Sequence, residues 1–370
     1  MLTILIFIAV LSLLVFVHEF GHFITAKRAG IRVEEFGFGF PPRAIGIKRG
    51  ETIYSINWIP LGGFVKIKGE TGEHRNDTDS FAHKRAPVRA LVLLAGVIMN
   101  VALAWFLLTI GYVIGMPEVI ENLSSRARVT DAKIQVVQVL AGSPADSAGV
   151  ESGDEIVRLD GQPPTDAEHV RAVAQARLGT PVAFTLRRSG VTLEKQATPA
   201  VLPETGKPGL GIALVTTGLV SYPIHIAPIE AAQTTWMLAR EIVLSFWGLL
   251  RELFVQHKVT VEFSGPVGIA VLTGEVARLG FRHLLQFTAM LSVNLAIINV
   301  LPFPALDGGR MLFLILESIR GRAVSRRFEI ATHNIGFALL MMLVVVVTYR
   351  DVVRFGGRIV HAFSSFFTAF

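Results

Sequence analysis

The sequence predicts a mainly α-helical membrane protein with four transmembrane helices, a membrane-associated β-loop and an inserted α+β domain. Of its 370 residues, 51% are hydrophobic and 17% are charged, and the mean hydropathy is +0.53. This balance is typical of proteins that span a bilayer. Four stretches reach the length of about 20 apolar residues that crosses the hydrocarbon core, at roughly 2–24, 89–115, 284–303 and 330–348.

The basic residues indicate how these helices are oriented. Lys and Arg are frequent between residues 27 and 89, and again between 310 and 327. By the positive-inside rule both segments are cytoplasmic, so the termini and the long segment 116–283 lie outside. Arginines in the C-terminal tail count against this orientation. The net charge of +6 is spread over the loops with no basic patch interleaved with aromatics, so no nucleic-acid partner is predicted.

Residues 31–70 are predicted to form the membrane-associated β-loop. They are too apolar for an ordinary cytoplasmic loop and contain too many Gly and Pro for a helix. From Thr52 to Ile67, side chains alternate with the period of two that is typical of strands. Irregular backbone at membrane depth has to be covered by protein. We therefore expect a loop that dips toward the first span, where its strands could pair with an extended peptide. A small cytoplasmic β-sheet packed on the helices is the alternative.

Residues 121–212 are more polar and contain short alternating strands. Their order of motifs resembles a PDZ domain in the circularly permuted form of bacterial proteases. The motifs are Gly142-Ser143-Pro144-Ala145, Ala148-Gly149-Val150, Gly153-Asp154-Glu155-Ile156 and Leu159-Asp160-Gly161. PDZ domains bind extended peptides at a sheet edge, so the resemblance implies extracytoplasmic peptides as partners. A spacer of the same fold without a ligand is the alternative.

Residues 224–282 are predicted to be amphipathic linker helices. Apolar residues such as Ile229, Trp236 and Ile242 recur at helical spacing, with charged residues between them. A fifth membrane span is the less favoured alternative, because of these charges.

A short polar motif lies inside the first predicted span, in His18-Glu19-Phe20-Gly21-His22. Histidines four residues apart share one helix face, so both imidazoles can bind one metal ion. Glu19 lies beside them, where a zinc hydrolase needs a general base. Ionisable groups at membrane depth are costly, which favours a functional role over a chance match. A cleaved signal peptide is disfavoured, because no basic n-region and no small-residue cleavage site is present.

A zinc site with two histidines needs a further protein ligand. The chain has no cysteine, so that ligand has to be His or a carboxylate. Asp307 follows the third span, after Pro302 and Pro304, on the same predicted cytoplasmic side as the two histidines. It would complete a His2Asp set. Alternatively, Asp307 is the N-cap of a helix over 308–320. Its position alone supports both interpretations equally.

The motifs together resemble the site-2 protease family of intramembrane zinc metalloproteases, of the regulator of sigma-E protease type. The resemblance rests on H-E-F-G-H in the first span, N-x-x-P-x-P-x-L-D-G in a later one, and the PDZ unit between them. It covers essentially the whole chain, and Ser264-Gly265-Pro266-Val267-Gly268 matches another family segment. Two departures stand out. Many close members carry two PDZ units where this chain shows one, and Arg310 stands where a histidine often follows the Gly-Gly pair.

The resemblance assigns a role to each residue of the motifs. It implies that His18, His22 and Asp307 bind Zn2+ and that Glu19 is the catalytic general base. Asn294 and Asn299 match family asparagines near the substrate or the oxyanion.

The resemblance also implies an activity and a location. The protein would be an intramembrane metalloendopeptidase that cleaves transmembrane segments of single-span membrane proteins in regulated intramembrane proteolysis. Anti-sigma factors and remnant signal peptides are the implied substrates. The implied location is the bacterial cytoplasmic (inner) membrane, where the chain is multi-pass, contacts the lipid bilayer and has its active site near the cytoplasmic side.

Two other functions fit part of the pattern. A membrane metal-ion transporter could use His18, His22 and Asp307 as a pathway site, but it would have no need of Glu19. An inactive scaffold could bind peptides through its PDZ unit, but it would need neither Glu19 nor Asp307.

The predicted segments are 1–30 (first transmembrane helix with HExxH), 31–70 (β-loop), 88–116 (second transmembrane helix), 121–212 (PDZ domain), 224–282 (amphipathic linker helices), 283–322 (third transmembrane helix with the LDG motif) and 328–349 (fourth transmembrane helix).

Overall fold

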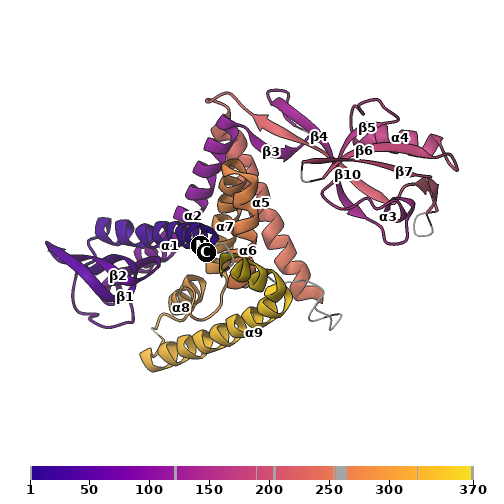
Figure 1. The fold of residues 1–370 in the computed structure, drawn as a ribbon. Coiled ribbons are helices and arrows are strands. Elements are labelled where there is room, and N and C mark those ends of the chain that lie inside the picture. The colour runs from indigo at the N-terminus through magenta and orange to yellow at the C-terminus, as the bar shows by residue number, and fades with distance from the viewer. Residues whose placement is uncertain are drawn as a thin grey trace. The chain divides into compact units, whose positions relative to one another are not determined.

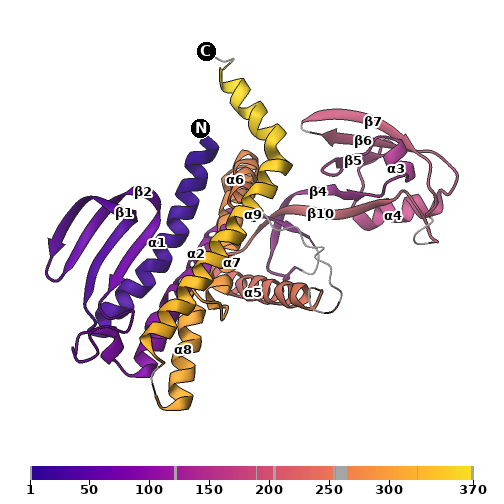
Figure 2. The same cartoon turned by 90° about the horizontal axis from the view of Figure 1, so that it is seen from below.

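The computed structural model describes residues 2–120, 123–188, 190–202, 206–252, 255, 265–322 and 324–367. The chain forms two compact units (Figures 1 and 2). The helical unit combines Met1–Ile110 with Pro228–Phe370, and the insert domain is Gly111–Ala227.

The helical unit contains the long apolar helices. Its helices are α1 (Leu2–Arg28), α2 (Ala86–Ile114), α5 (Ala227–Arg251), α6 (Pro266–Leu279), α7 (Phe281–Val300), α8 (Asp307–Arg320) and α9 (Arg326–Phe367). Among the described residues, α1, α2, α7 and the Arg326–Arg354 part of α9 are long and apolar enough to cross a membrane. Helices α1 and α2 approach each other closely where Gly21 faces Ala95, since a Cβ on Gly21 would lie 2.4 Å from the Ala95 carbonyl oxygen. Small residues permit this kind of contact between membrane helices.

The predicted third membrane segment, 283–322, consists of two helices in the structure. Helix α7 ends at Val300, and α8 begins at Asp307 after a turn that contains Pro302 and Pro304. Proline lacks the amide hydrogen that a continuous helix would need, so a break is expected here. The break places Asp307 at the start of a new helix.

The β-loop consists of two long strands, β1 (Val33–Arg49) and β2 (Thr52–Ile67), which lie alongside α1 (Figure 2). Its register is more complex than that of a hairpin. Residues 33–38 pair with 63–67 on one side and with 53–56 on the other, while 43–49 pair with 52–57. The strands therefore fold back on themselves, and the segment 63–67 forms the sheet edge nearest α1. The Ser12 hydroxyl donates to the Pro60 carbonyl over 2.8 Å and ties the loop to this helix.

Aromatic packing explains why the β-loop rests on α1. The Phe23 and Phe36 rings stack with centroids 4.4 Å apart, and Phe16 and Phe20 contact Phe36 as well. Such ring pairs stabilise a contact beyond their buried area.

The insert domain is a six-stranded sheet with the strand order β3-β10-β4-β5-β6-β7. Its strands are β3 (Met116–Val119), β4 (Arg128–Val139), β5 (Glu155–Leu159), β6 (Val182–Arg188), β7 (Val191–Ala197) and β10 (Ile212–Ser221); β8 (Ala200–Val201) and β9 (Pro208–Gly209) form a separate pair, and the helices are α3 (Pro144–Ser147) and α4 (Ala167–Ala176). The unit extends past the predicted bounds 121–212 on both sides, because β3 and most of β10 lie outside them and pair with each other.

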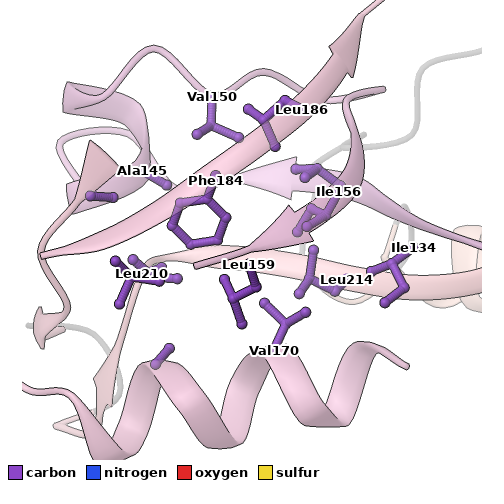
Figure 3. Close-up of a cluster of buried hydrophobic side chains, with 14 of the residues drawn as sticks. Ile134, Ala145, Val150, Ile156, Leu159, Val170, Phe184, Leu186, Leu210 and Leu214 are labelled. Atoms are coloured by element: carbon purple, nitrogen blue, oxygen red, sulfur yellow. The ribbon is translucent and has the colours of Figure 1, made fainter. Parts of the chain in front are cut away.

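The core of the insert domain lies between α4 and the sheet. Figure 3 shows Val170 pointing from α4 toward the strands that carry Leu159 and Leu214. Val170, Val182 and Leu186 are almost completely buried. Burial of such side chains stabilises a fold by about 1.5–3 kcal/mol each, so this unit has a substantial core of its own.

An ion pair between Arg188 and the buried Asp154 carboxylate joins two segments of this domain. The Arg188 guanidinium donates to both Asp154 carboxylate oxygens, over 2.7 and 2.8 Å, and the Glu151 amide donates to one of them. Burial raises the pKa of Asp154, but these hydrogen bonds lower it by more, so the pKa lies below its usual value.

Candidate metal centre

Three potential metal ligands from two helices converge in the helical unit. His18 and His22 lie one turn apart on α1, and Asp307 is the first residue of α8. The Asp307 Oδ2 atom lies 3.0 Å from His18 Nε2 and 3.3 Å from His22 Nε2, and the two Nε2 atoms are 3.1 Å apart. Both histidines are buried. No other group of at least three metal-binding side chains was found among the described residues.

The donor set and its spacing fit a tetrahedral zinc ion. Zinc binds histidine nitrogen and carboxylate oxygen at about 2.0–2.1 Å. Two corners of a tetrahedron with such bonds lie about 3.3 Å apart, close to the three observed separations. The buried Asp307 Oδ2 accepts no well-aligned hydrogen bond, although both Nε2 atoms lie within 3.3 Å of it. A cation between the three atoms would satisfy it.

The hydrogen bond behind His22 fixes which nitrogen faces the centre. Its Nδ1 atom lies 2.8 Å from the Val92 carbonyl oxygen on α2. A carbonyl only accepts, so Nδ1 carries the hydrogen and Nε2 keeps its lone pair for a metal. Such partners orient zinc-binding histidines and contribute to metal affinity.

His18 has its own partner, which is Asn100 on α2. The Asn100 Nδ2 atom lies 3.4 Å from His18 Nδ1, and the buried Asn100 Oδ1 has no partner. Exchanging the amide nitrogen and oxygen would place Oδ1 against a protonated Nδ1, and shape alone does not distinguish the two orientations. The exchanged orientation satisfies both groups and leaves His18 Nε2 free for metal. The backbone carbonyl of Asn100 accepts a hydrogen bond from the Ser292 hydroxyl over 2.8 Å, and this bond links α2 to α7.

Gly96 gives the two imidazoles their space. A Cβ at this position would lie 2.4 Å from His22 Nε2 and 2.6 Å from His18 Cε1. The rings therefore lie directly against the backbone of α2, one turn from Asn100. Only glycine permits this approach.

The Asp307 side chain does not act as a helix cap. The N-cap of α8 is Leu306, which makes no side-chain capping bond, and Asp307 lies in the first turn with its carboxylate toward the histidines. The sequence position of Asp307 allowed a metal ligand or an N-cap, and the N-cap interpretation is wrong.

The turn before Asp307 is held from α9. Ala305 has a φ of 81° and donates its amide to His333 Nδ1 over 2.9 Å. A Cβ on Gly336 would lie 2.4 Å from Pro304 Cβ, so α9 packs against the same turn. Positive φ is unfavourable for alanine, and these contacts from α9 hold the turn in this conformation.

Glu19 lies next to the convergent ligands and is half-buried. Its carboxylate makes no hydrogen bond or ion pair with another residue in the described part of the chain. A Cβ on Gly63 would lie 3.0 Å from Glu19 Cβ, so the β2 edge passes directly over this side chain. The Glu19 carboxylate therefore lies between the three convergent side chains and the edge of β2, where Gly63 is buried against α1.

The two asparagines expected near the substrate are not part of this cluster. Asn294 and Asn299 lie half-buried on α7, and neither makes a hydrogen bond to another described residue. The structure instead places Asn100, a polar residue within the second predicted span, at His18. Arg310, the departure from the family pattern, forms an ion pair with Glu70.

Part of the chain is similar to solved structures, among them a PDZ domain. The PDZ domain of an SdrC-like protein from Listeria innocua is 22% identical, covers 22% of this chain and 92% of that domain, and gives a TM-score of 0.21. A solution structure from Geobacillus thermodenitrificans is 28% identical over 22% of this chain and 94% of that one, with a TM-score of 0.20.

Sequence comparisons cover nearly the whole chain. Zinc metalloprotease RasP of Geobacillus kaustophilus is 30% identical over 94% of this chain and 97% of that protein. A candidate zinc metalloprotease of Clostridium perfringens is 36% identical over 92% of this chain and 96% of that protein. The model of peptidase family M50 matches residues 6–343. The chain therefore belongs to peptidase family M50, the site-2 protease family that its motifs resemble, and is a zinc metalloprotease.

Proposed function

We propose that His18, His22 and Asp307 hold the catalytic Zn2+ and that Glu19 is the general base of an intramembrane endopeptidase. The observation that carries this proposal is the convergence of the three ligand atoms beside a carboxylate that has no partner of its own. Zinc bound there would supply a Lewis acid that polarises the scissile carbonyl and lowers the pKa of water.

Glu19 takes the proton of the attacking water and passes it to the leaving amine. Three features suit it to this role. It follows His18 directly, it is half-buried, and no described residue competes for its carboxylate. Asn294 or Asn299 donates to the oxyanion that forms on the peptide carbonyl. Their amides on α7 make no other hydrogen bond to a described residue, so they are available for this contact.

A substrate helix has to unwind before cleavage, because a helix shields its carbonyls in its own hydrogen bonds. The β2 edge at residues 63–67 offers backbone partners for the extended strand that results. The close contact of Gly63 with Glu19 means that such a strand would run past the general base. The predicted β-loop at 31–70 thus becomes the substrate-binding edge of the site.

The protein lies in the bacterial cytoplasmic membrane with four spans, and its site is near the cytoplasmic side. The segments between 27 and 89 and between 310 and 327 carry the basic residues that favour this orientation. Its substrates are single-span membrane proteins, such as anti-sigma factors or remnant signal peptides. The insert domain is a PDZ domain outside the membrane that binds peptides and excludes bulky ectodomains.

Co-expression with a tagged single-span substrate tests this function. The wild type should cleave it, whereas Glu19→Gln and Asp307→Ala should each reduce cleavage by at least about a hundredfold, in the range for loss of a general base. Glu194→Gln, an exposed glutamate on β7, is the matched control and should cleave normally.

The zinc content of the purified proteins separates the two roles. Glu19→Gln should keep its zinc and Asp307→Ala should lose it, because only Asp307 is a ligand. Normal cleavage by Glu19→Gln would contradict the general-base assignment. Zinc transport that survives in Glu19→Gln, with no cleavage by the wild type, would favour the transporter.

A further inference from the structure

The insert domain has a groove between α4 and the chain from Pro208 to Leu214. Its cavity measures about 430 Å3. Its apolar lining includes Leu140, Val170, Leu210, Ile212 and Leu214. Three of these, Val170, Leu210 and Leu214, also belong to the buried core drawn in Figure 3. Among the described residues that line the cavity, Arg171 is the only charged one.

One wall of the groove is an open strand edge. Residues 217–220 of β10 pair with β3, and the Ile120 amide donates to the Thr216 carbonyl, so this side of β10 is covered from residue 216 onward. In the described part of the chain, residues 212–215 pair only with β4, on the other side. Backbone groups alternate along a strand. Because the Thr216 carbonyl faces the β3 side, the groups of Ile212 and Leu214 face the open side as well.

Arg171 occupies the open edge. Its Nη2 atom donates to the Leu214 carbonyl over 3.0 Å, and its Nη1 atom donates to Glu168 over 3.1 Å. The arginine reaches from α4 across the groove to the carbonyl that an added strand would use. A peptide that pairs with Leu214 therefore has to displace this guanidinium.

We propose that Arg171 makes the groove selective for extended peptides that carry an acidic side chain opposite Leu214. A peptide amide would replace the guanidinium on the Leu214 carbonyl, as in strand addition. The displaced Nη2 atom then loses its acceptor, while Nη1 still pairs with Glu168, and a peptide carboxylate offers Nη2 a charge-assisted hydrogen bond in exchange. A neutral peptide leaves Arg171 without this partner and competes directly with its bond to Leu214. The proposal rests on the peptide-binding role proposed for the insert domain, but not on the proteolytic reaction.

Peptide binding to the full-length protein in detergent tests this selectivity. The Glu19→Gln background prevents cleavage, so the outcome does not depend on the protease assignment. The probes are labelled hexapeptides that end in an apolar residue. Each peptide carries one glutamate, at a different position in each member of the series, and has a counterpart with glutamine at that position. Binding of the two is compared by fluorescence anisotropy. For one position in the series, the glutamate peptide should bind about two- to fivefold more tightly than its glutamine counterpart, which is the range for a half-exposed ion pair. Raising the salt concentration should reduce this preference.

Arg171→Ala should change the affinities for the acidic and the neutral peptide in opposite directions. Arg171→Ala should weaken binding of the acidic peptide and strengthen binding of the neutral one, because the Leu214 carbonyl becomes free. Arg171→Lys should keep part of the preference. Arg177→Ala is the matched control, because Arg177 pairs with Asp160 over 2.6 Å and does not line the cavity.

Three results would overturn the proposal. They are equal binding of both peptides by the wild type, an unchanged preference in Arg171→Ala, and no binding of any hexapeptide. Unfolding curves of the variants show whether a lost affinity reflects a lost fold. If the peptide-binding results contradict the proposal while cleavage still depends on Glu19, the proposed protease function is unaffected.

Discussion

Replacing Gly96 with alanine should remove zinc from the protein although Gly96 is not a ligand. The new Cβ would lie 2.4 Å from His22 Nε2 and 2.6 Å from His18 Cε1, whereas carbon contacts are normally about 3.5–4.0 Å. The rings or the helices have to separate by about 1 Å to reach ordinary contact. Val92 fixes His22 from behind, and the contact of Gly21 with Ala95 fixes α1 against α2. The three atoms nearest to the new Cβ all belong to the two histidine rings, so the shift falls on the proposed ligands.

The expected loss follows from how precisely metal sites are built. Ligands have to lie within about 0.2 Å of their ideal distances, so a shift of about 1 Å removes at least one of them. Zinc affinity should fall at least as far as on loss of an orienting partner, about 10- to 100-fold. Cleavage should fall about a hundredfold, as for a 1 Å misplacement of a catalytic group. Zinc per protein is measured by mass spectrometry after dialysis against graded chelator, and cleavage with the tagged substrate.

Gly248→Ala is the matched control for this variant. Gly248 lies in helix α5 with no atom within 4 Å of an added Cβ. Alanine is favoured over glycine in a helix by about 1 kcal/mol, so this variant should be at least as stable as the wild type and keep its zinc. If Gly96→Ala binds zinc as tightly as Gly248→Ala, the histidine rings do not lie against α2 as the structure has them.

Two further predictions concern the insert domain and the turn before α8. Arg188→Ala should lower the free energy of unfolding of the insert domain by about 2 kcal/mol at pH 7, the range for hydrogen bonds to a charged group. The lowered pKa of Asp154 means that its stabilisation is present above about pH 4 and is lost as the pH falls through that lowered value. Thermal unfolding of wild type and variant should therefore converge in acid, and a gap that stays constant from pH 7 to pH 3 would contradict this. His333→Ala should weaken zinc binding several-fold, since it frees a strained turn, and Ala305→Gly in the same protein should restore part of it, because glycine adopts positive φ freely. Thr332→Ala, its neighbour on α9, should bind zinc normally, and chelator titrations that rank these proteins otherwise would refute the role of His333.

The convergence of His18, His22 and Asp307 could be predicted because their signals are local or follow from topology. The spacing of His18 and His22 fixes their common helix face without any knowledge of the fold. The positive-inside pattern placed Asp307 on the same side of the membrane. The zinc metalloprotease class that these motifs implied is confirmed by the match to family M50. The roles of the individual residues stay predictions until the variants are measured.

The surroundings of the histidines could not be predicted, because they depend on how α2 is rotated about its axis. Gly96 and Asn100 are four residues apart in an apolar helix, and nothing in their neighbourhood marks the face that meets α1. The contact between Asn100 and His18 joins residues 82 positions apart. The choice between ligand and cap at Asp307 also depended on packing, because the sequence pattern around it suits both.

The β-loop shows a similar limit. The alternation from Thr52 to Ile67 predicted strands, but alternation says nothing about partners. The double pairing of residues 33–38 depends on long-range contacts, and so does the contact of Gly63 with Glu19. The ion pair of Arg310 with Glu70 was equally hidden, because it joins two segments that are 240 positions apart.

The separation of the proposed ligands along the chain sets a delay on the assembly of the site. Asp307 follows His22 by 285 positions, and the insert domain lies between them. A ribosome that adds roughly 5–20 residues per second needs on the order of 15–60 s to cover this stretch. Throughout that time α1 holds two histidines and Glu19 without the third ligand. On the proposed ligand set, the zinc site therefore stays incomplete until translation has passed α8.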